Sequence, residues 1–150
     1  MARTIKGQIK GADVASKNAR GNASRFKVNE NTQDHDNSNI IFSLERVVNG
    51  KHCFSKLDKN HKAFFAEAIF RRKDFTWKSI QEQDRHGLGC EKIARKSIKV
   101  AIPKEIPDDT EYFLAFRYKA MHPMVGIRRQ NVFYVLWFDH DFKVYPHKNA

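Results

Sequence analysis

The sequence predicts an α+β domain in which about two helices pack on a C-terminal antiparallel β-meander of about four strands, after a short first strand. Apolar residues recur at intervals of three and four between residues 59 and 73, as on one face of a helix. Short apolar runs follow one another closely after residue 111, and such short connections require antiparallel neighbours because a parallel crossover needs about a dozen residues. The chain has 150 residues, 41% of them hydrophobic, which is enough for the core of one such domain.

The chain divides into an arm and a domain near residue 38. Residues 1–38 are polar, rich in Lys, Asn, Gly and Ser, and show neither helical nor strand periodicity. Such a segment buries too little apolar surface to offset the entropy of ordering, so we expect a flexible basic arm. Residues 39–150 carry the apolar patterns and are predicted to form the single α+β domain.

The first half of the domain predicts one strand and two helices. The apolar run Asn39–Leu44 is compatible with a short strand. Asp58 is placed to cap an amphipathic helix over about residues 59–73. Thr76 is placed to cap a second, shorter helix that ends near Gly87.

Four strand-like runs near the C-terminus predict the meander. They are Tyr112–Tyr118, Met124–Arg128, Val132–Phe138 and Phe142–Tyr145. In the third run Phe133, Val135 and Trp137 are predicted on one face, and the alternate positions are apolar as well, which is typical of a central strand. Residues 97–102 also alternate, but Pro103 interrupts the pattern.

The net charge of +11 bears most directly on binding partners. Residues 39–150 hold 21 Lys and Arg against 13 Asp and Glu, so most of the excess belongs to the domain. A domain this basic attracts polyanions, and nucleic acid is the commonest of these in a cytoplasm. The alternative interpretation is a charged surface for solubility, or a face matched to an acidic protein.

Several classes of protein and site find no support. No apolar run approaches the roughly 18–20 residues of a membrane span, and the basic N-terminus lacks the apolar core of a secretory signal. Two cysteines, Cys53 and Cys90, fit a reducing cytoplasm. The metal-binding patterns CxxC and HExxH are absent, and Asp139–Asp141 is interpreted as a hairpin turn. We therefore expect a cytoplasmic protein without metal, cofactor or membrane contact.

Metal-independent cleavage of RNA is a chemistry that these residues support. RNA carries its own nucleophile, the 2′-hydroxyl, so a protein needs a base for its proton, an acid for the leaving oxygen and cations for the charge around phosphorus. Suitable side chains in the last third of the chain are Arg117, Tyr118, Lys119, His122, Arg128, Arg129, Tyr145 and His147.

Strand geometry favours one cluster among these residues. Tyr145 and His147 are two residues apart and share one side of an extended chain. In the predicted meander, Arg128 or Arg129 meets them at one end of the sheet, with Arg117 farther away. The expected nucleic-acid contacts are Arg117, Lys119, Arg129 and Lys143. Exposed residues at strand ends, with Tyr145 packed as an aromatic, are the alternative.

A strand, two helices and an antiparallel meander that ends in Tyr and His resemble the RelE-type toxins, compact basic proteins that cleave mRNA, often on the ribosome. Residues 126–139 are similar to the family's pattern of an Arg-bearing strand, a turn, an aromatic-aliphatic strand and an Asp. The resemblance implies that Arg128 stabilises the phosphate as a cation and that Tyr145 or His147 is the acid or base. Such a toxin has an acidic antitoxin protein as its expected partner.

The leading hypothesis is therefore a metal-independent endoribonuclease of toxin type, which cleaves RNA through attack of the 2′-hydroxyl. One alternative is a non-catalytic nucleic-acid-binding module that uses the arm and the basic face for phosphate contacts. The other alternative is a protein-interaction accessory domain without nucleic-acid contact.

Overall fold

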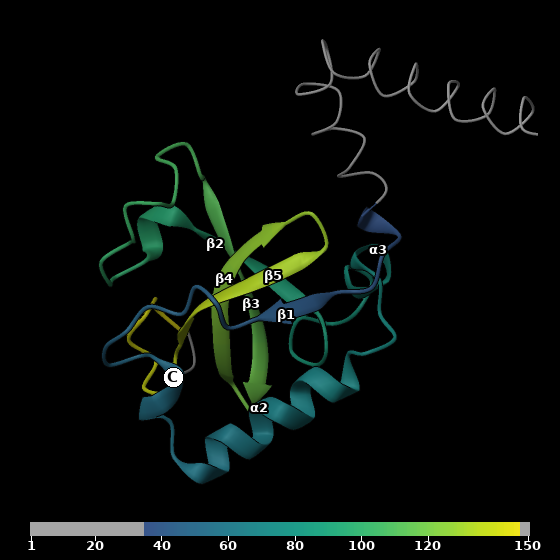
Figure 1. The fold of residues 1–150 in the computed structure, drawn as a ribbon, viewed down its shortest axis with the longest axis horizontal. Helices are drawn as coiled ribbons and strands as arrows, with labels where there is room; N and C mark the ends of the chain where they lie inside the picture. The colour runs from purple at the N-terminus through teal and green to yellow at the C-terminus, as the bar shows by residue number, and fades with distance from the viewer. Residues whose placement is uncertain (1–34, 148–150) are drawn as a thin grey trace, which may run out of the picture. The chain divides into compact units, whose positions relative to one another are not determined.

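A five-stranded mixed β-sheet forms the centre of the computed structural model, which describes residues 35–147 (Figure 1). The strands are β1 (Ile41–Ser43), β2 (Cys90–Ala94), β3 (Tyr112–Lys119), β4 (His122–Arg129) and β5 (Val132–Phe138). Their order across the sheet is β1-β5-β4-β3-β2. Strands β2 to β5 are antiparallel neighbours, whereas β1 lies parallel to β5. The α+β class is therefore confirmed, and the sheet is mixed rather than wholly antiparallel.

The ordered domain begins slightly before the predicted boundary at residue 39. The compact unit starts at His35. Asp36 forms an ion pair with Arg128 at 2.7 Å, and the carbonyl of Ser38 accepts the backbone N–H of Trp77 at 3.2 Å. The remainder of the predicted basic arm lies outside the described residues.

Two α-helices follow β1, and side-chain caps define where each begins. Helix α2 (Lys59–Arg71) begins after Asp58, whose carboxylate accepts a backbone N–H of the first turn at 2.8 Å. Helix α3 (Trp77–Ile80) begins after Thr76, which forms a reciprocal capping box with the third residue of the helix. Two short 3₁₀ helices complete the elements, η1 (Phe54–Lys56) and η2 (Arg95–Ser97).

Helix α3 is much shorter than the sequence predicts. Residues 81–89 form turns that Asp84 organises: its carbonyl accepts the N–H groups of Gly87 and Gly89, and its side chain accepts that of His86. A short carboxylate that bonds its own backbone competes with helix formation. The prediction that this helix extends to Gly87 is therefore wrong.

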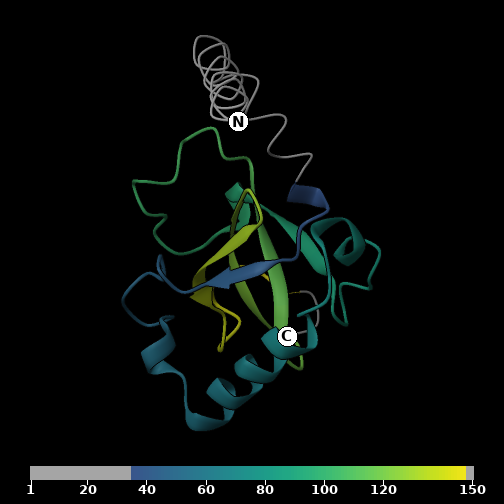
Figure 2. The ribbon, with the colours of Figure 1, turned by 45° about the vertical axis from the view of Figure 1, so that its right-hand side comes forward.

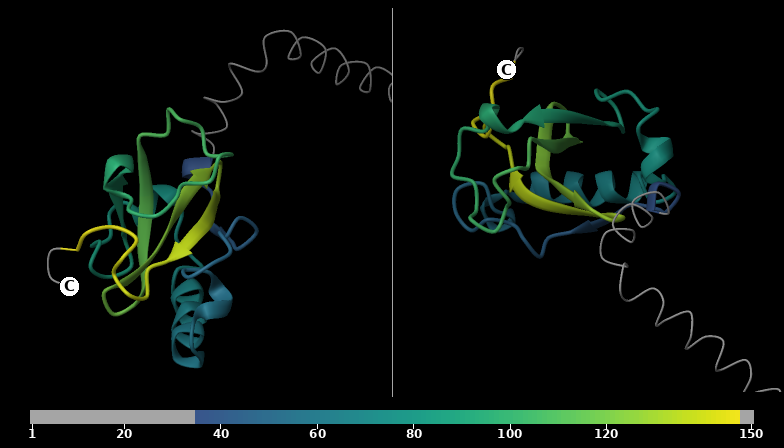
Figure 3. Two further views of the ribbon diagram at one scale, coloured as in Figure 1. Left: turned by 90° about the vertical axis from the view of Figure 1, so that its left-hand side faces the viewer. Right: turned by 90° about the horizontal axis from the view of Figure 1, so that it is seen from above.

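Each face of the sheet carries its own apolar core. On one face Trp77 of α3 and side chains of α2 pack with Phe116 and other strand residues. Helix α2 contacts β3, and Figures 2 and 3 show it beside the end of the sheet where β3 leads into β4. The segment between β2 and β3 covers the opposite face through Ile106 and the alternating residues 98–102, which form no strand. The sheet is thus covered on both faces.

A bulge in β5 changes the face that its last side chains occupy. The pairing of β4 with β5 shifts between Val125 and Gly126, so that Leu136 is the extra residue on β5. Trp137 consequently packs in the core opposite to that of Phe133. The prediction that these two residues share a face is wrong, because strict alternation stops at the bulge.

Gly126 permits this bulge, since a Cβ at its position would lie 1.9 Å from the carbonyl oxygen of Tyr134. We expect Gly126→Ala to lower the free energy of unfolding by about 3 kcal/mol, because the strand backbones must separate. Urea unfolding followed by circular dichroism measures this change. Gly87→Ala is the matched control, because its Cβ would meet nothing closer than 3.6 Å. Equal losses in the two variants would contradict the prediction.

The chain after β5 is not a strand, although the sequence predicts one over Phe142–Tyr145. Asp139 holds this segment in a turn, because its Oδ1 accepts the backbone N–H groups of Lys143 and Val144 at 2.8 and 3.1 Å. Phe142 has a φ of 60°, in the left-handed region, which an extended strand does not contain. The segment therefore stays at the end of β5, beside the start of β4.

Candidate functional site

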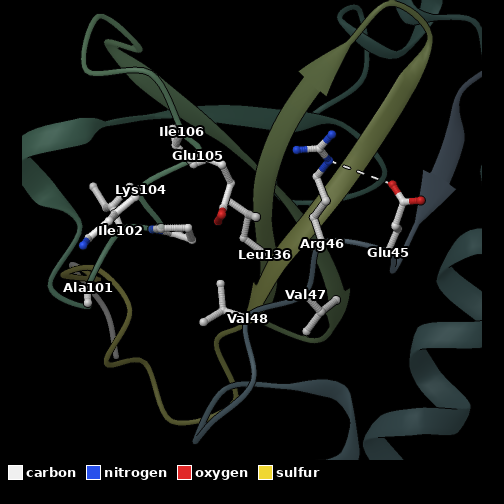
Figure 4. A pocket seen from close by; sticks show the side chains of 11 residues that line it. Glu45, Arg46, Val47, Val48, Ala101, Ile102, Lys104, Glu105, Ile106 and Leu136 are labelled. Atoms are coloured by element: carbon white, nitrogen blue, oxygen red, sulfur yellow. Dashed lines mark ion pairs between the residues drawn. The ribbon is translucent and has the colours of Figure 1, made fainter.

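One pocket of about 540 Å³ has a mainly aliphatic lining with charged residues at its sides. Figure 4 shows the segment 45–48 on one side of it, the segment 101–106 on the other, and Leu136 of β5 between them. Its charged lining residues are Glu45, Arg46, Lys104 and Glu105, and the ion pair of Glu45 with Arg46 joins two largely exposed side chains at 4.0 Å. Its lining includes no histidine, tyrosine or cysteine, so this pocket offers no group for proton transfer near neutral pH.

A smaller pocket of about 280 Å³ holds a denser set of titratable groups. Strands β2 and β3, the turn before β2 and the C-terminal segment form its walls. Its polar lining residues are Arg85, His86, Glu91, Lys92, Ser97, Arg117, Tyr145 and His147. The pocket therefore brings two residues of the predicted catalytic group, Tyr145 and His147, together with Arg117.

A buried carboxylate orients His147 at this pocket. Asp139 is fully buried, and its Oδ2 lies 2.7 Å from Nε2 of His147. The other oxygen of the carboxylate accepts two backbone N–H groups, which prevents Asp139 from turning away. When Nε2 donates to Asp139, Nδ1 is left as the ring nitrogen that accepts a proton. A histidine oriented by a buried carboxylate in this way is suited to work as a base.

Two aromatic rings hold the imidazole of His147. The centroids of Tyr145 and Phe142 lie 4.1 and 5.0 Å from that of His147. Phe142 in turn stacks on His122 at 4.3 Å. The imidazole is 8% exposed, so it is shielded from bulk water while it borders the pocket.

Tyr145 belongs to a short chain of polar groups. Its hydroxyl lies 3.4 Å from Oε1 of Glu91, and Nη1 of Arg85 donates to the other oxygen of Glu91 at 2.8 Å. Burial raises the pKa of Tyr145, and the neighbouring Glu91 carboxylate raises it further. The hydroxyl of Tyr145 therefore keeps its proton at neutral pH.

A third pocket, of about 300 Å³, adjoins the pocket of Tyr145 and His147, and the two share the lining residues His86 and Arg117. The ring of Phe64 on α2 lines it, 45% exposed, and Nζ of Lys119 lies 5.3 Å from the centroid of that ring. The cationic residues lining the two pockets are Arg71, Arg72, Arg85, Lys92, Arg117 and Lys119, and the carboxylate is Glu91. This excess of positive charge favours the binding of phosphates.

Arg72 holds together the elements that form these pockets. Its guanidinium is buried and donates to a carbonyl of α2, to the carbonyls of Gly87 and Leu88, and to the carbonyl of Arg117 on β3. Burial lowers the pKa of Arg72 to about 10, so the group remains charged at neutral pH. Arg72 thus fixes the turn that carries Arg85 against the helix and the strand.

Arg128 lies at the opposite end of the sheet from Tyr145 and His147. Arg128 lies near the end of β4, paired with Phe133 near the start of β5. Tyr145 and His147 follow the end of β5, and the stretch of β5 from Phe133 to Phe138 spans roughly 16 Å. The guanidinium of Arg128 pairs with Asp36 at 2.7 Å and lies 4.4 Å above the ring of Trp77. The predicted cluster of these three residues is therefore wrong, because the segment after β5 does not return along the sheet.

The predicted nucleic-acid contacts divide between different parts of the domain. Arg117 and Lys119 line the two adjoining pockets. Arg129 is the exposed last residue of β4, at the far end of the sheet. Lys143 is exposed on the C-terminal segment, between Asp139 and His147. Only the first two belong to the pocket surface.

Sequence reasoning missed three residues of the candidate site. Asp139 carried the clearest signal, since it directly follows the continuous apolar run of β5 and precedes a histidine on the same short segment. Glu91 and Arg85 had no recognisable signal in the sequence. Strand β2, which holds Glu91, was not predicted, and the turn that holds Arg85 was predicted to be helical.

Comparison of the chain with protein-family models, with curated proteins and with solved structures finds no match. In the part of the chain that the structure describes, no helix has both the length and the apolar character needed to cross a membrane.

Proposed function

We propose that this protein is a metal-independent endoribonuclease of toxin type that cleaves RNA phosphodiesters. The observation that carries the proposal is the buried pair of Asp139 and His147 at a pocket that Arg117 and Tyr145 also line. An oriented base, a proton donor and a cation are the groups that attack by the 2′-hydroxyl requires.

In this mechanism Nδ1 of His147 takes the proton of the 2′-hydroxyl, and the 2′-oxygen attacks the adjacent phosphorus. Asp139 stabilises the resulting imidazolium, and Arg117 donates to the oxygens of the phosphorane as their charge increases. The bond from phosphorus to the 5′-oxygen then breaks, and this oxygen takes the proton of Tyr145. The products are a 2′,3′-cyclic phosphate and a 5′-hydroxyl, and solvent returns the proton on His147 to Tyr145.

The adjoining pocket offers a place for a neighbouring nucleotide. Phe64 presents a half-exposed ring on which a base can stack, and Lys119 lies over the same ring. Stacking on an aromatic side chain contributes about 1–3 kcal/mol per base and accepts any base. A single RNA strand that crosses Arg117 would therefore place its phosphates along the cations of both pockets.

The toxin class is supported by the sequence resemblance of residues 126–139 and by the charge of the domain. The net charge of +11 and the positive pocket surface favour an acidic protein as the neutralising partner. An acidic antitoxin segment would occupy the cations that RNA uses. The expected substrate is mRNA, free or bound to the ribosome.

A non-catalytic nucleic-acid-binding module is the second candidate. The run of cations across both pockets favours it, because that surface binds phosphates whether or not a bond is cleaved. The two candidates differ in a single observable, the formation of cleavage products.

Replacing Arg117 tests the proposal. We expect Arg117→Ala to lower the rate of cleavage by about 10²-fold, because Arg117 neutralises charge that increases in the transition state. The assay follows a labelled single-stranded RNA in buffer with EDTA and analyses the products for 2′,3′-cyclic phosphate ends. Arg46→Ala is the matched control, because Arg46 lines the separate aliphatic pocket.

The assay separates the candidates. An RNA with a 2′-deoxynucleotide at the cleaved position is expected to remain intact, since the nucleophile is missing. Salt-sensitive retention of RNA by the wild-type protein without cleavage would overturn the ribonuclease in favour of the binding module. Absence of both retention and cleavage would overturn both.

A further inference from the structure

Two histidines and an aspartate meet at a place that the proposed cleavage does not use. His52 lies before η1, and His140 and Asp141 follow β5. Each residue offers one ligand atom, and the three atoms lie within 4.8 Å of one another. In the closest pair, Nε2 of His52 is 2.9 Å from Oδ1 of Asp141. The sequence predicts only a hairpin turn at Asp139–Asp141, because Asp and His are common in turns between strands.

Backbone hydrogen bonds fix the two segments that supply these side chains. The N–H of Phe138, the last residue of β5, donates to the carbonyl of His52 at 2.8 Å. The N–H of His140 donates back to the carbonyl of Phe138 at 2.9 Å. His52 is also buried, so its ring position is set by packing rather than by solvent. The cluster is therefore built into the end of the sheet and is not a chance meeting of loose side chains.

The second nitrogen of His140 has the kind of partner that metal-bound histidines have. Nε2 of His140 lies 3.0 Å from the backbone carbonyl of Lys51. A carbonyl oxygen only accepts hydrogen bonds, so Nε2 carries the proton. Nδ1 of His140 is then unprotonated, and its lone pair is available to a metal. Metal-binding histidines donate their other ring N–H to a carbonyl or carboxylate in this way, which fixes the tautomer and the ring orientation.

We propose that His52, His140 and Asp141 form a binding site for a divalent transition metal, with Zn²⁺ as the best match. Two imidazole nitrogens and one carboxylate oxygen, with water at the fourth position, are a donor set that Zn²⁺ accepts. Zn²⁺ takes such ligands at about 2.0–2.2 Å, which requires the three atoms to approach to roughly 3.4 Å of one another. The hydrogen-bonded pair of His52 and Asp141, now 2.9 Å apart, must therefore lose its shared proton and separate by about half an ångström, and Asp141 and His140 are only partly buried and can adjust.

Lys51 is the group that competes with a metal. Its Nζ lies 3.2 Å from Oδ2 of Asp141, so an ammonium already neutralises part of the carboxylate. The side chain of Lys51 is 67% exposed and is free to move into solvent when a cation binds Oδ1. The charge of Lys51 weakens Zn²⁺ binding, and its removal should strengthen it.

A metal at this position would tie the segment before η1 to the segment after β5. Asp139 and His147 lie on that second segment, but their own hydrogen bonds hold them. The site therefore takes no part in the proposed proton transfers. The inference does not depend on the ribonuclease proposal.

Isothermal titration of the full chain with ZnCl₂, after treatment with a chelator and dialysis, tests the proposal. We expect one Zn²⁺ per chain in the wild type and affinity lowered by about 100-fold or more in His140→Ala and in Asp141→Ala. Co²⁺ should give the visible absorption band of a low-coordinate site in the wild type but not in these two variants. Zn²⁺ should also raise the unfolding temperature of the wild type but not of these variants.

Two further variants complete the experiment. His35→Ala is the matched control, because His35 is a histidine outside the cluster, and it should bind as the wild type does. Lys51→Gln should bind Zn²⁺ more tightly. Wild-type affinity in His140→Ala, or no binding of Zn²⁺ and Co²⁺ by the wild type, would overturn the proposal. Weaker Zn²⁺ binding in Lys51→Gln would also contradict the proposal. It would mean that the ion pair of Lys51 with Asp141 supports the cluster and does not compete with the metal.

Discussion

Replacing His147 with alanine is expected to lower the rate of RNA cleavage by about 10²–10⁴-fold, the largest effect on activity that the site predicts. His147 is the base whose Nδ1 takes the 2′-hydroxyl proton, and Asp139 holds its other nitrogen at 2.7 Å. The measurement is the single-turnover rate on a labelled RNA, together with the thermal unfolding temperature of each variant. Added imidazole should restore part of the rate of His147→Ala, which a merely misfolded variant would not show.

Asp139→Asn separates orientation from proton transfer. The amide retains one oxygen for the backbone N–H groups of Lys143 and Val144 but no longer accepts at the position that faces His147. We therefore expect a large loss of rate with little change in RNA affinity, because Asp139 is a fully buried positioning residue that orients His147. Full activity in both His147→Ala and Asp139→Asn would show that the base lies elsewhere.

Replacing Arg72 with alanine is expected to lower the free energy of unfolding by about 3 kcal/mol or more, the largest expected effect of a single side chain on stability. The substitution removes donors from four carbonyls and leaves a cavity beside Phe116, whose ring lies 5.2 Å from the guanidinium. Removal of a buried charge offsets part of this loss, but the carbonyls that lose their donor lie in buried or part-buried surroundings. Chemical denaturation followed by tryptophan fluorescence measures the change.

Two comparisons show which interaction of Arg72 matters. Arg71→Ala is the control, since Arg71 is exposed and its loss should change stability by less than about 0.5 kcal/mol. Arg72→Met keeps most of the packing volume but none of the hydrogen bonds. A variant Arg72→Met as stable as the wild type would show that the hydrogen bonds between α2, the Gly87–Leu88 turn and β3 contribute nothing.

The regular elements could be predicted wherever one periodicity continued without interruption. Helix α2 and strands β3, β4 and β5 have apolar patterns long enough to identify each by itself. Side-chain hydrogen bonds to the backbone ended other elements earlier than their patterns indicated. Asp84 holds the residues after the second helix in turns, and Asp139 turns the chain after β5 away from the sheet. The partners of a carboxylate are not visible in a pattern of apolar residues.

The candidate site could be predicted only in part. The spacing of Tyr145 and His147 identified them as neighbours, since only Pro146 separates them whether the chain is a strand or not. The cation beside them depended on the path of the chain after β5. A returning strand would have brought them to Arg128, whereas the observed turn leaves them beside Arg117. Glu91 and Arg85 enter the pocket through β2 and its preceding turn, which have no distinctive periodicity.

The parallel pairing at the edge of the sheet has a consequence for how the chain folds. Ile41 lies opposite Val132, so the first strand can join only after nearly the whole domain has been made and gathered. Closing so long a loop costs entropy before any contact is gained, and three paired residues return little. We therefore expect β2 to β5 to assemble early through their short connections, with β1 docking as the last step and detaching first when the native state opens locally.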